Sequence, residues 1–258
     1  MSRTLVFGDI HGCFAELEAL LEKLQPTTKD RLIFLGDLVD KGPQSAAVVK
    51  LVRSLSDEMH NVILIQGNHE EKHSRWWHHV SCGNGRERKL KGHEEILGIQ
   101  KDLSDADRYF LFSESKLFYS FHSVSSLAVH GGIPKELATL PLVYSATYTP
   151  DKATRKTWDR ILRLRYVDAD TGAFVASDMK NPKAVLWPTH YDNRFGTIYY
   201  GHIAYVKSQA PVVSNDTVGL DLGCVFGNVL CAQILHEDGR EECVTVPARR
   251  QYAEIWDD

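Results

Sequence analysis

One short pattern occurs three times in the first seventy residues and constrains the fold more than any other feature. At residues 5–11, 33–40 and 62–70, an apolar run ends near a Gly, and polar side chains follow at once. Short apolar runs closed by Gly or Pro are typical of buried strands. The copies are about 30 residues apart, the length of one strand–helix–strand unit. The sequence therefore predicts parallel strands whose carboxyl ends meet and carry a site.

The intervening and later segments predict an α/β fold with mixed sheets. Residues 14–24 and 45–55 carry helical apolar stripes, as crossover helices do. Later strands are predicted at 117–121, 126–129, 197–200, 229–235 and 241–246, with a turn at 122–125. We expect one domain over residues 1–258, with a mainly helical insertion at about 71–103. A second, irregular and loop-rich insertion is expected at about 135–195.

Composition excludes several classes of partner. The 258 residues are 43% hydrophobic and 25% charged, an ordinary balance for a globular protein. The net charge of −4 gives no electrostatic reason to expect a stable nucleic-acid or membrane partner. No apolar run approaches the roughly 18 residues of a membrane span, and the first residues read as a strand rather than a signal peptide. Five cysteines without paired zinc spacing complete the expectation of a cytoplasmic protein.

The side chains at the predicted strand ends are typical metal ligands. They are Asp9, His11, Asp37, Asn68, His130 and His202. Oxygen and imidazole donors together favour first-row divalent metals over calcium. Because six ligands exceed one tetrahedral site, we expect two ions bridged by the central Asp37 carboxylate. Mn²⁺ is the expected metal, with Fe, Zn, Co or Ni as alternatives. A hydroxide bridging two such ions would attack phosphorus in line.

Residues beside these ligands suggest how a leaving group could be protonated. His69 directly follows Asn68, which places it next to the site as a candidate general acid. Asp40 could hold the His69 ring and stabilise its charged form, and Lys41 offers a positive charge to phosphate oxygens. The other histidines of the 71–103 insertion show no fixed partner. Its basic cluster, Arg86, Arg88, Lys89 and Lys91, is interpreted as a solvated face, with a groove for polyanions as the alternative.

The motifs GDIHG, GDLVDKGP, GNHE, HGG and a late GH occur in this order along the chain. Together they closely resemble the signatures of the phosphoprotein phosphatase family of metallophosphoesterases. The resemblance implies a four-layer sandwich of two mixed sheets flanked by helices. It implies one ion held by Asp9, His11 and Asp37, and a second held by Asp37, Asn68, His130 and His202. His69 would be the general acid, with Asp40 as its partner.

Two positions depart from the family pattern. The phosphate-binding Arg of the second motif is Lys41 here, which replaces a bidentate fork with a point charge. The Tyr of the late motif is Phe226. The KGP variant and the stretch LRLRYVDADTG resemble the bacterial, diadenosine-tetraphosphatase-like branch. The second phosphate-contacting Arg has no secure match, so Arg165 is the first candidate and Arg194 the second.

These observations favour a two-metal phosphatase that hydrolyses phosphate esters or anhydrides, similar to serine/threonine protein phosphatases. The alternative is a hydrolase that cleaves dinucleoside polyphosphates such as diadenosine tetraphosphate symmetrically, or that cleaves polyphosphate. The expected substrate is thus a phosphorylated protein, a nucleotide or polyphosphate, and capped RNA also falls within the branch. A binding scaffold with a decayed site is a third reading. It is disfavoured because neither a ligand nor the acid is missing.

Overall fold

The computed structural model describes residues 2–121, 126–140 and 152–255 of the chain. Its first sheet has the strand order β13-β12-β1-β2-β3. These strands are β1 (Arg3–Phe7), β2 (Arg31–Phe34), β3 (Val62–Leu64), β12 (Val229–His236) and β13 (Glu241–Pro247). β1, β2 and β3 run parallel, whereas β12 and β13 are antiparallel additions. The predicted parallel trio is confirmed.

The second sheet has the order β10-β11-β9-β5-β4. Its strands are β4 (Phe118–Phe121), β5 (Ser126–Val129), β9 (Thr197–Tyr200), β10 (Val212–Ser214) and β11 (Thr217–Gly219). β5 pairs in parallel with β9, with Val129 opposite Tyr200. The residues that follow these two strands therefore emerge side by side. The turn predicted at 122–125 lies outside the described residues.

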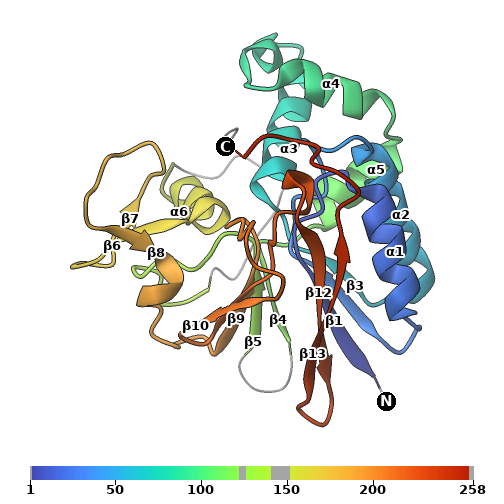
Figure 1. Cartoon of the computed structure of the whole chain (residues 1–258). Helices are drawn as coiled ribbons and strands as arrows, with labels where there is room; N and C mark the ends of the chain where they lie inside the picture. Colours follow the sequence, from blue (N-terminus) through green and yellow to red (C-terminus); the bar gives the residue numbers. More distant parts are fainter. Residues whose placement is uncertain (1, 122–125, 141–151, 256–258) are drawn as a thin grey trace.

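The two sheets pack face to face, and helices cover the outer face of the first (Figure 1). Val6 and Ile33 from the first sheet meet Tyr199 and Val218 from the second in one buried apolar cluster. α1 (Phe14–Leu24), α2 (Ser45–Met59), α5 (Asp105–Tyr109) and the π-turn η2 (Phe110–Glu114) form the outer layer on the first sheet. The predicted four-layer sandwich is confirmed. Among the described residues, no helix combines the length and apolar character needed to cross a membrane.

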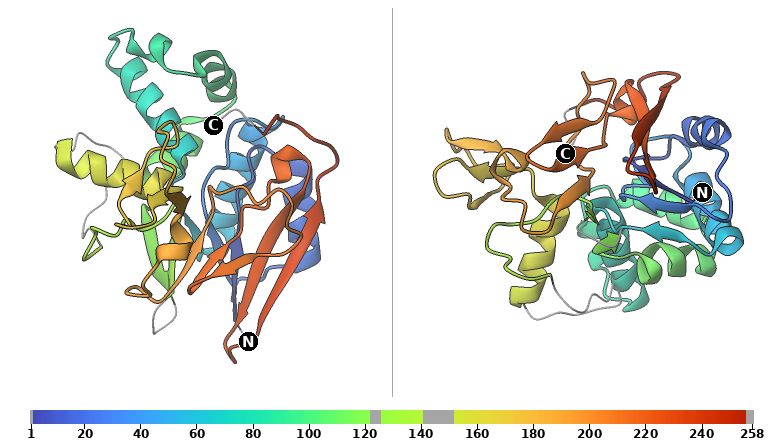
Figure 2. Two further views of the ribbon diagram at one scale, coloured as in Figure 1. Left: turned by 60° about the vertical axis from the view of Figure 1, so that its left-hand side comes forward. Right: turned by 90° about the horizontal axis from the view of Figure 1, so that it is seen from below.

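The first insertion is helical, as predicted. It contains α3 (Asn68–Ser81), the 3₁₀ turn η1 (Arg86–Lys89) and α4 (His93–Lys101). In Figure 1 and the left view of Figure 2, residues 68–101 (teal to green) project away from the sheets. α3 begins within the GNHE motif itself, so the insertion grows directly out of the site.

The second insertion is more regular than predicted, in the part that is described. It holds α6 (Lys152–Arg163), the 3₁₀ turn η3 (Trp187–His190), and a small sheet of β6 (Tyr166–Asp168), β7 (Phe174–Val175) and β8 (Ala184–Leu186). This small sheet and η3 pack on the outer face of the second sheet. Strands of two or three residues are too short to show an alternating pattern, which explains why the sequence indicated loops.

Candidate metal centre

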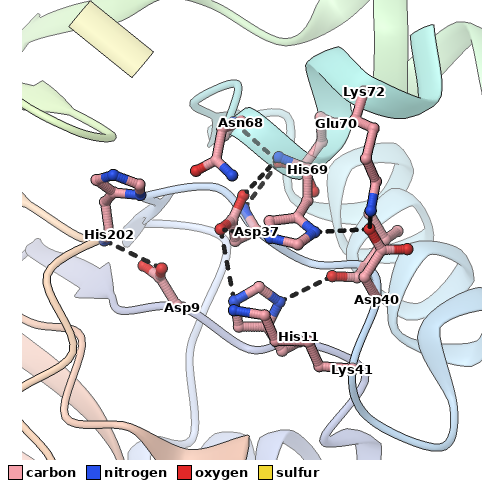
Figure 3. Close-up of polar contacts among 12 residues, drawn as sticks. Asp9, His11, Asp37, Asp40, Lys41, Asn68, His69, Glu70, Lys72 and His202 are labelled. Atoms are coloured by element: carbon pink, nitrogen blue, oxygen red, sulfur yellow. Dashed lines mark hydrogen bonds and ion pairs between the residues drawn. The ribbon is translucent and has the colours of Figure 1, made fainter. Parts of the chain in front are cut away.

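All six predicted ligands lie at one end of the two-sheet sandwich. Asp9 and Asp37 follow β1 and β2, and Asn68 is the first residue of α3. His130 directly follows β5, and His202 comes two residues after β9. Figure 3 shows Asp37 in the middle of this group. Because all these strands run parallel within their sheets, their carboxyl ends bring the side chains together, as the sequence predicts.

A single carboxylate oxygen of Asp37 faces both halves of the molecule. Asp37 Oδ2 lies 3.5 Å from His11 Nε2 and 3.4 Å from His130 Nε2. His11 belongs to the first sheet and His130 to the second. Two groups of potential ligands, His11–Asp37–His69 and Asp37–His130–His202, therefore share Asp37, with the ligand atoms of each group within 4.8 Å of one another. This arrangement fits two cations that share one carboxylate.

Both of these imidazoles are oriented by backbone carbonyls. His11 Nδ1 donates to the carbonyl of Val39 at 2.9 Å, and His130 Nδ1 donates to that of Leu35 at 2.8 Å. A hydrogen bond at Nδ1 fixes the tautomer and turns Nε2 toward the centre, as is usual for histidines that bind metals. Asn68 Oδ1 lies 2.9 Å from His130 Nε2, so these two ligand atoms are also adjacent.

Asp9 supplies a further test of whether the site fits a cation. Its Oδ2 accepts the backbone N–H of His202 at 3.0 Å. Its Oδ1 is buried and has no hydrogen-bond partner within the described part of the chain. Burial, with the nearby charges of Asp221 and Asp37, raises the pKa of Asp9 well above its ordinary value. A buried carboxylate oxygen of this kind is costly unless it coordinates a cation, so the donor set fits divalent metal ions.

The electrostatics of the centre also fit the binding of a cation. Burial and the charge of Asp37 raise the pKa of Glu70 to about 7. Burial opposes ionisation of Asp37, but the facing His130 and His69 outweigh it and lower the pKa of that carboxyl. Burial and the charge of Lys41 lower the pKa of His11 to about 3, which favours the neutral imidazole that a metal requires.

Glu70 holds the backbone that carries the Asp37 carboxylate. Its Oε2 accepts the N–H groups of Asp37 and Gly67, and its Oε1 accepts that of Leu38, each at 2.8 Å. The bond to Gly67 is the return half of a capping box at the start of α3. Glu70 is fully buried, so these bonds tie the end of β2 rigidly to the start of the helix.

The predicted pair of His69 and Asp40 is in hydrogen-bond contact. His69 Nδ1 lies 2.6 Å from Asp40 Oδ2, and His69 Nε2 lies 3.9 Å from Asp37 Oδ2. The ring thus points one nitrogen at its carboxylate partner and the other at the centre (Figure 3). Such an orientation suits a general acid at the site.

Sequence reasoning missed the groups that support Asp40. Its Oδ1 accepts from His73 Nε2 at 2.7 Å, and Lys72 forms an ion pair with Oδ2. His73 Nδ1 in turn accepts from the amide of Gln100 at 2.9 Å. Burial opposes ionisation of Asp40, yet the bonds from His69 and His73 hold its pKa far below the ordinary value. The expectation that the insertion histidines lack a fixed partner is therefore wrong for His73. Its position four residues after His69, on one helix face, was the available signal.

Backbone strain is concentrated at the same residues. Five of them adopt positive φ angles, in the region that side chains other than Gly rarely enter. They are His11 (46°), Asp37 (51°), Asp40 (68°), Lys41 (66°) and His202 (64°). Each such residue costs roughly 1–3 kcal/mol and persists only where the surrounding structure holds it. Strain of this kind clusters at functional sites, which agrees with the placement of the ligands.

The candidate phosphate contacts differ in their surroundings. Lys41 Nζ lies 5.1 Å from the centroid of the Phe226 ring, so the two departures from the family pattern contact each other. Arg165 donates to the carbonyl of His202 at 3.1 Å, which places it beside a ligand. Arg194 instead donates to the carbonyls of Pro134 and Lys135. The structure therefore favours Arg165 over Arg194 as a phosphate contact.

The basic cluster of the first insertion lies at the surface. The side chains of Arg86, Arg88, Lys89 and Lys91 are exposed. η1 follows the C-terminal end of α3, a helix of 14 residues that begins at Asn68. This position agrees with the interpretation as a solvated face.

Comparison with known proteins identifies the family. The model of the calcineurin-like phosphoesterase family matches residues 2–205. The chain belongs to this family. It is a metal-dependent hydrolase of phosphate esters or anhydrides, and the family implies divalent metal ions. The ligand clusters described above agree with that requirement.

Relatives within the family carry related names. A bis(5'-nucleosyl)-tetraphosphatase PrpE, described as asymmetrical, from Oceanobacillus iheyensis is 30% identical over 96% of this chain and 93% of its own. A bis(5'-nucleosyl)-tetraphosphatase described as symmetrical, from Cellvibrio japonicus, is 26% identical over 93% of this chain and 98% of its own. The crystal structure of a putative diadenosine tetraphosphatase matches with a TM-score of 0.69 at 22% identity, covering 95% of this chain and 93% of that one. This last likeness confirms the fold.

Proposed function

We propose that this phosphoesterase hydrolyses a phosphoanhydride bond of dinucleoside tetraphosphates, with diadenosine tetraphosphate as the representative substrate. The observation that carries the chemistry is the Asp37 carboxylate oxygen shared between His11 and His130. The names of the relatives from Oceanobacillus iheyensis and Cellvibrio japonicus support the substrate class. We propose Mn²⁺ as the native metal, because carboxylate, amide and imidazole donors are combined.

The ligand set divides into two groups that share Asp37. Asp9, His11 and Asp37 would hold one cation, and Asp37, Asn68, His130 and His202 would hold the other. When bound, the two cations supply Lewis acidity and lower the pKa of a water nucleophile. The chain's own task is to position them, and the fixed Nε2 atoms of His11 and His130 do so.

The remaining site residues act on the substrate. Lys41 and Arg165 contribute positive charge for phosphate oxygens near the centre. His69 presents Nε2 toward the centre and would give a proton to the departing oxygen. Asp40 holds the His69 ring by the 2.6 Å bond and stabilises its charged form. A phosphoanhydride oxygen leaves as a weakly basic phosphate, so the proton matters less there than in an ester.

Product analysis with diadenosine tetraphosphate tests the proposal. Purified protein loaded with Mn²⁺ should release ATP and AMP in equal amounts if cleavage is asymmetrical, and two ADP if it is symmetrical. We expect ATP and AMP, because the relative from Oceanobacillus iheyensis is described as asymmetrical. ADP alone would restore the symmetrical alternative. No hydrolysis, with full activity on p-nitrophenyl phosphate, would refute the proposed substrate class.

A second candidate is the hydrolysis of phosphoserine or phosphothreonine esters. The His69–Asp40 pair favours it, because an alkoxide leaving group requires a proton donor far more than an anhydride does. A phosphopeptide assayed beside diadenosine tetraphosphate separates the candidates. A kcat/KM for the peptide at least ten times that for the dinucleotide would make the phosphoprotein function the preferred one.

A further inference from the structure

A cavity of about 420 Å³ opens next to the metal centre, between the loop after Asp40 and the C-terminal segment. Its lining consists of Lys41, Gly42 and Pro43 on one side and Arg250, Gln251 and Tyr252 on the other. Figure 1 shows the segment after β13 (dark red) crossing back over the end of the first sheet. The cavity thus joins residues that lie about 200 positions apart in the chain, and it carries two cationic side chains.

Hydrogen bonds to Glu16 of α1 and to the Val225 carbonyl hold the C-terminal side of the cavity in place. Glu16 Oε1, on the buried side chain of α1, accepts the Tyr252 hydroxyl at 2.7 Å and the backbone N–H of Arg249 at 2.9 Å. The N–H groups of Tyr252 and Ala253 donate to the carbonyl of Val225. These bonds fix the backbone on both sides of Arg250, whose guanidinium carbon lies 5.2 Å from the centroid of the Tyr252 ring.

The other side of the cavity abuts the metal centre. A Cβ added to Gly42 would lie 1.9 Å from the carbonyl oxygen of His11, so the cavity loop packs directly against a ligand residue. Lys41 Nζ lies over Phe226, which neighbours the Val225 carbonyl that anchors the C-terminal segment. Lys41 therefore lies close enough to the centre to act on His11, and it lines the same cavity as Arg250.

We propose that this cavity is a second anion subsite. It would hold the phosphate groups of a nucleoside polyphosphate that lie beyond the phosphorus under attack. Lys41 and Arg250 would pair with successive phosphates of the chain, and its size falls in the range of small-ligand pockets. The subsite deepens the proposed function and rests on it for the identity of the substrate. A single phosphoryl group at the metal centre, as in p-nitrophenyl phosphate, has no phosphate to place there.

Binding to the metal-loaded protein tests the subsite directly. The probes are β,γ-methylene ATP, tripolyphosphate and AMP, measured by isothermal titration calorimetry with wild type and Arg250→Ala. We expect the substitution to weaken binding of the first two about threefold to tenfold, the range for a partly exposed charge-assisted contact. AMP binding should change less than twofold. The loss should shrink in high salt, because screening weakens contacts between exposed charges.

Arg249→Ala is the matched control, since Arg249 is also exposed and does not line the cavity. It should bind all three probes as wild type does. Arg250→Lys keeps the charge and should retain most of the affinity. Equal affinity of wild type and Arg250→Ala for β,γ-methylene ATP would overturn the proposal. So would an equal loss for AMP, which would place the effect at the nucleoside.

Kinetics separate the subsite from the proposed function. For Arg250→Ala, the ratio of KM for diadenosine tetraphosphate to KM for p-nitrophenyl phosphate should rise about threefold to tenfold. If wild type leaves diadenosine tetraphosphate intact while Arg250→Ala still weakens methylene ATP binding, the proposed function fails and the subsite stands. The other outcome is that wild type cleaves the dinucleotide while Arg250→Ala changes neither the KM ratio nor the affinity for β,γ-methylene ATP. In that case only the subsite fails.

Discussion

Glu70 offers the sharpest test of how the centre is held, because its three acceptor contacts define the expected loss. In Glu70→Gln, one carboxylate oxygen becomes an NH₂ group. The amide can keep its oxygen toward Asp37 and Gly67, which then turns the NH₂ group toward the N–H of Leu38. The Leu38 N–H and the amide N–H that faces it are then both left without an acceptor, which costs at least about 1–3 kcal/mol of unfolding free energy. Glu70→Ala leaves three donors unsatisfied and a cavity, so it should cost at least about 3 kcal/mol.

Urea unfolding followed by tryptophan fluorescence measures this loss in the metal-free and the metal-loaded protein. The loss should be larger with metal, because a displaced Asp37 backbone weakens binding and so reduces stabilisation by the ligand. Glu95→Gln is the control: Glu95 Oε1 accepts the N–H of Lys41 at 2.8 Å, but Glu95 is exposed and water can replace it. Glu95→Gln should lower the free energy of unfolding by less than about 0.5 kcal/mol. Equal losses for Glu70→Gln and Glu95→Gln would refute the argument from burial.

Four further outcomes follow from the contacts of single side chains. Asp37→Asn should abolish turnover and lower the bound metal measured by elemental analysis, whereas full metal with near-normal activity would exclude a shared ligand. His69→Asn should reduce kcat by roughly 10²–10⁴ with metal retained, and less for p-nitrophenyl than for alkyl phosphates. His73→Ala should reduce kcat for alkyl phosphates without changing KM, and an unchanged kcat would reduce His73 to a packing role. Arg3 and backbone N–H groups oppose the burial penalty and lower the pKa of Asp30 from 3.8 to about 2. A depressed carboxyl pKa stabilises the fold above pH 4 and loses that effect on acidification. The free energy of unfolding that is lost between pH 4 and pH 2 should therefore be about 1–2 kcal/mol smaller in Asp30→Asn than in wild type.

Sequence reasoning could bring the candidate ligands together because they follow one rule. Asp9, Asp37, His130 and His202 each come directly or within three residues after a strand. Parallel pairing then brings strand ends together whatever the intervening loops do. The parallel neighbours β1, β2 and β3 and the central position of Asp37 needed only the spacing and order of the motifs. The helices α1 and α2 were predictable for the same reason, since each must cross over between parallel strands.

The parts that could not be predicted depend on tertiary contacts between distant segments. Lys72 and His73 reach Asp40 only because α3 starts at the motif and lies against the loop after β2. Arg250 comes beside Lys41 because a carboxylate on α1 captures the C-terminal backbone. The spacing of His69 and His73 places both on one helix face, but nothing in the sequence shows that this face meets Asp40, and the contact made by Arg250 leaves no sequence signal. The short strands β6, β7 and β8 were missed because two or three residues cannot show a period.

The two substrate candidates place opposite demands on the same loop. Asp40 faces the acid His69, and the next residue, Lys41, faces the C-terminal cavity. An ester substrate needs the His69–Asp40 pair, since its leaving oxygen must be protonated, and it has no further phosphates for the cavity that Arg250 lines. An anhydride substrate carries phosphates for the cavity and relies little on the pair. The Asp40 contacts to His69, His73 and Lys72 alone would suit an ester. A single phosphoryl group at the centre would leave the proposed subsite at Arg250 without a phosphate, and this is why we propose the anhydride as the substrate class.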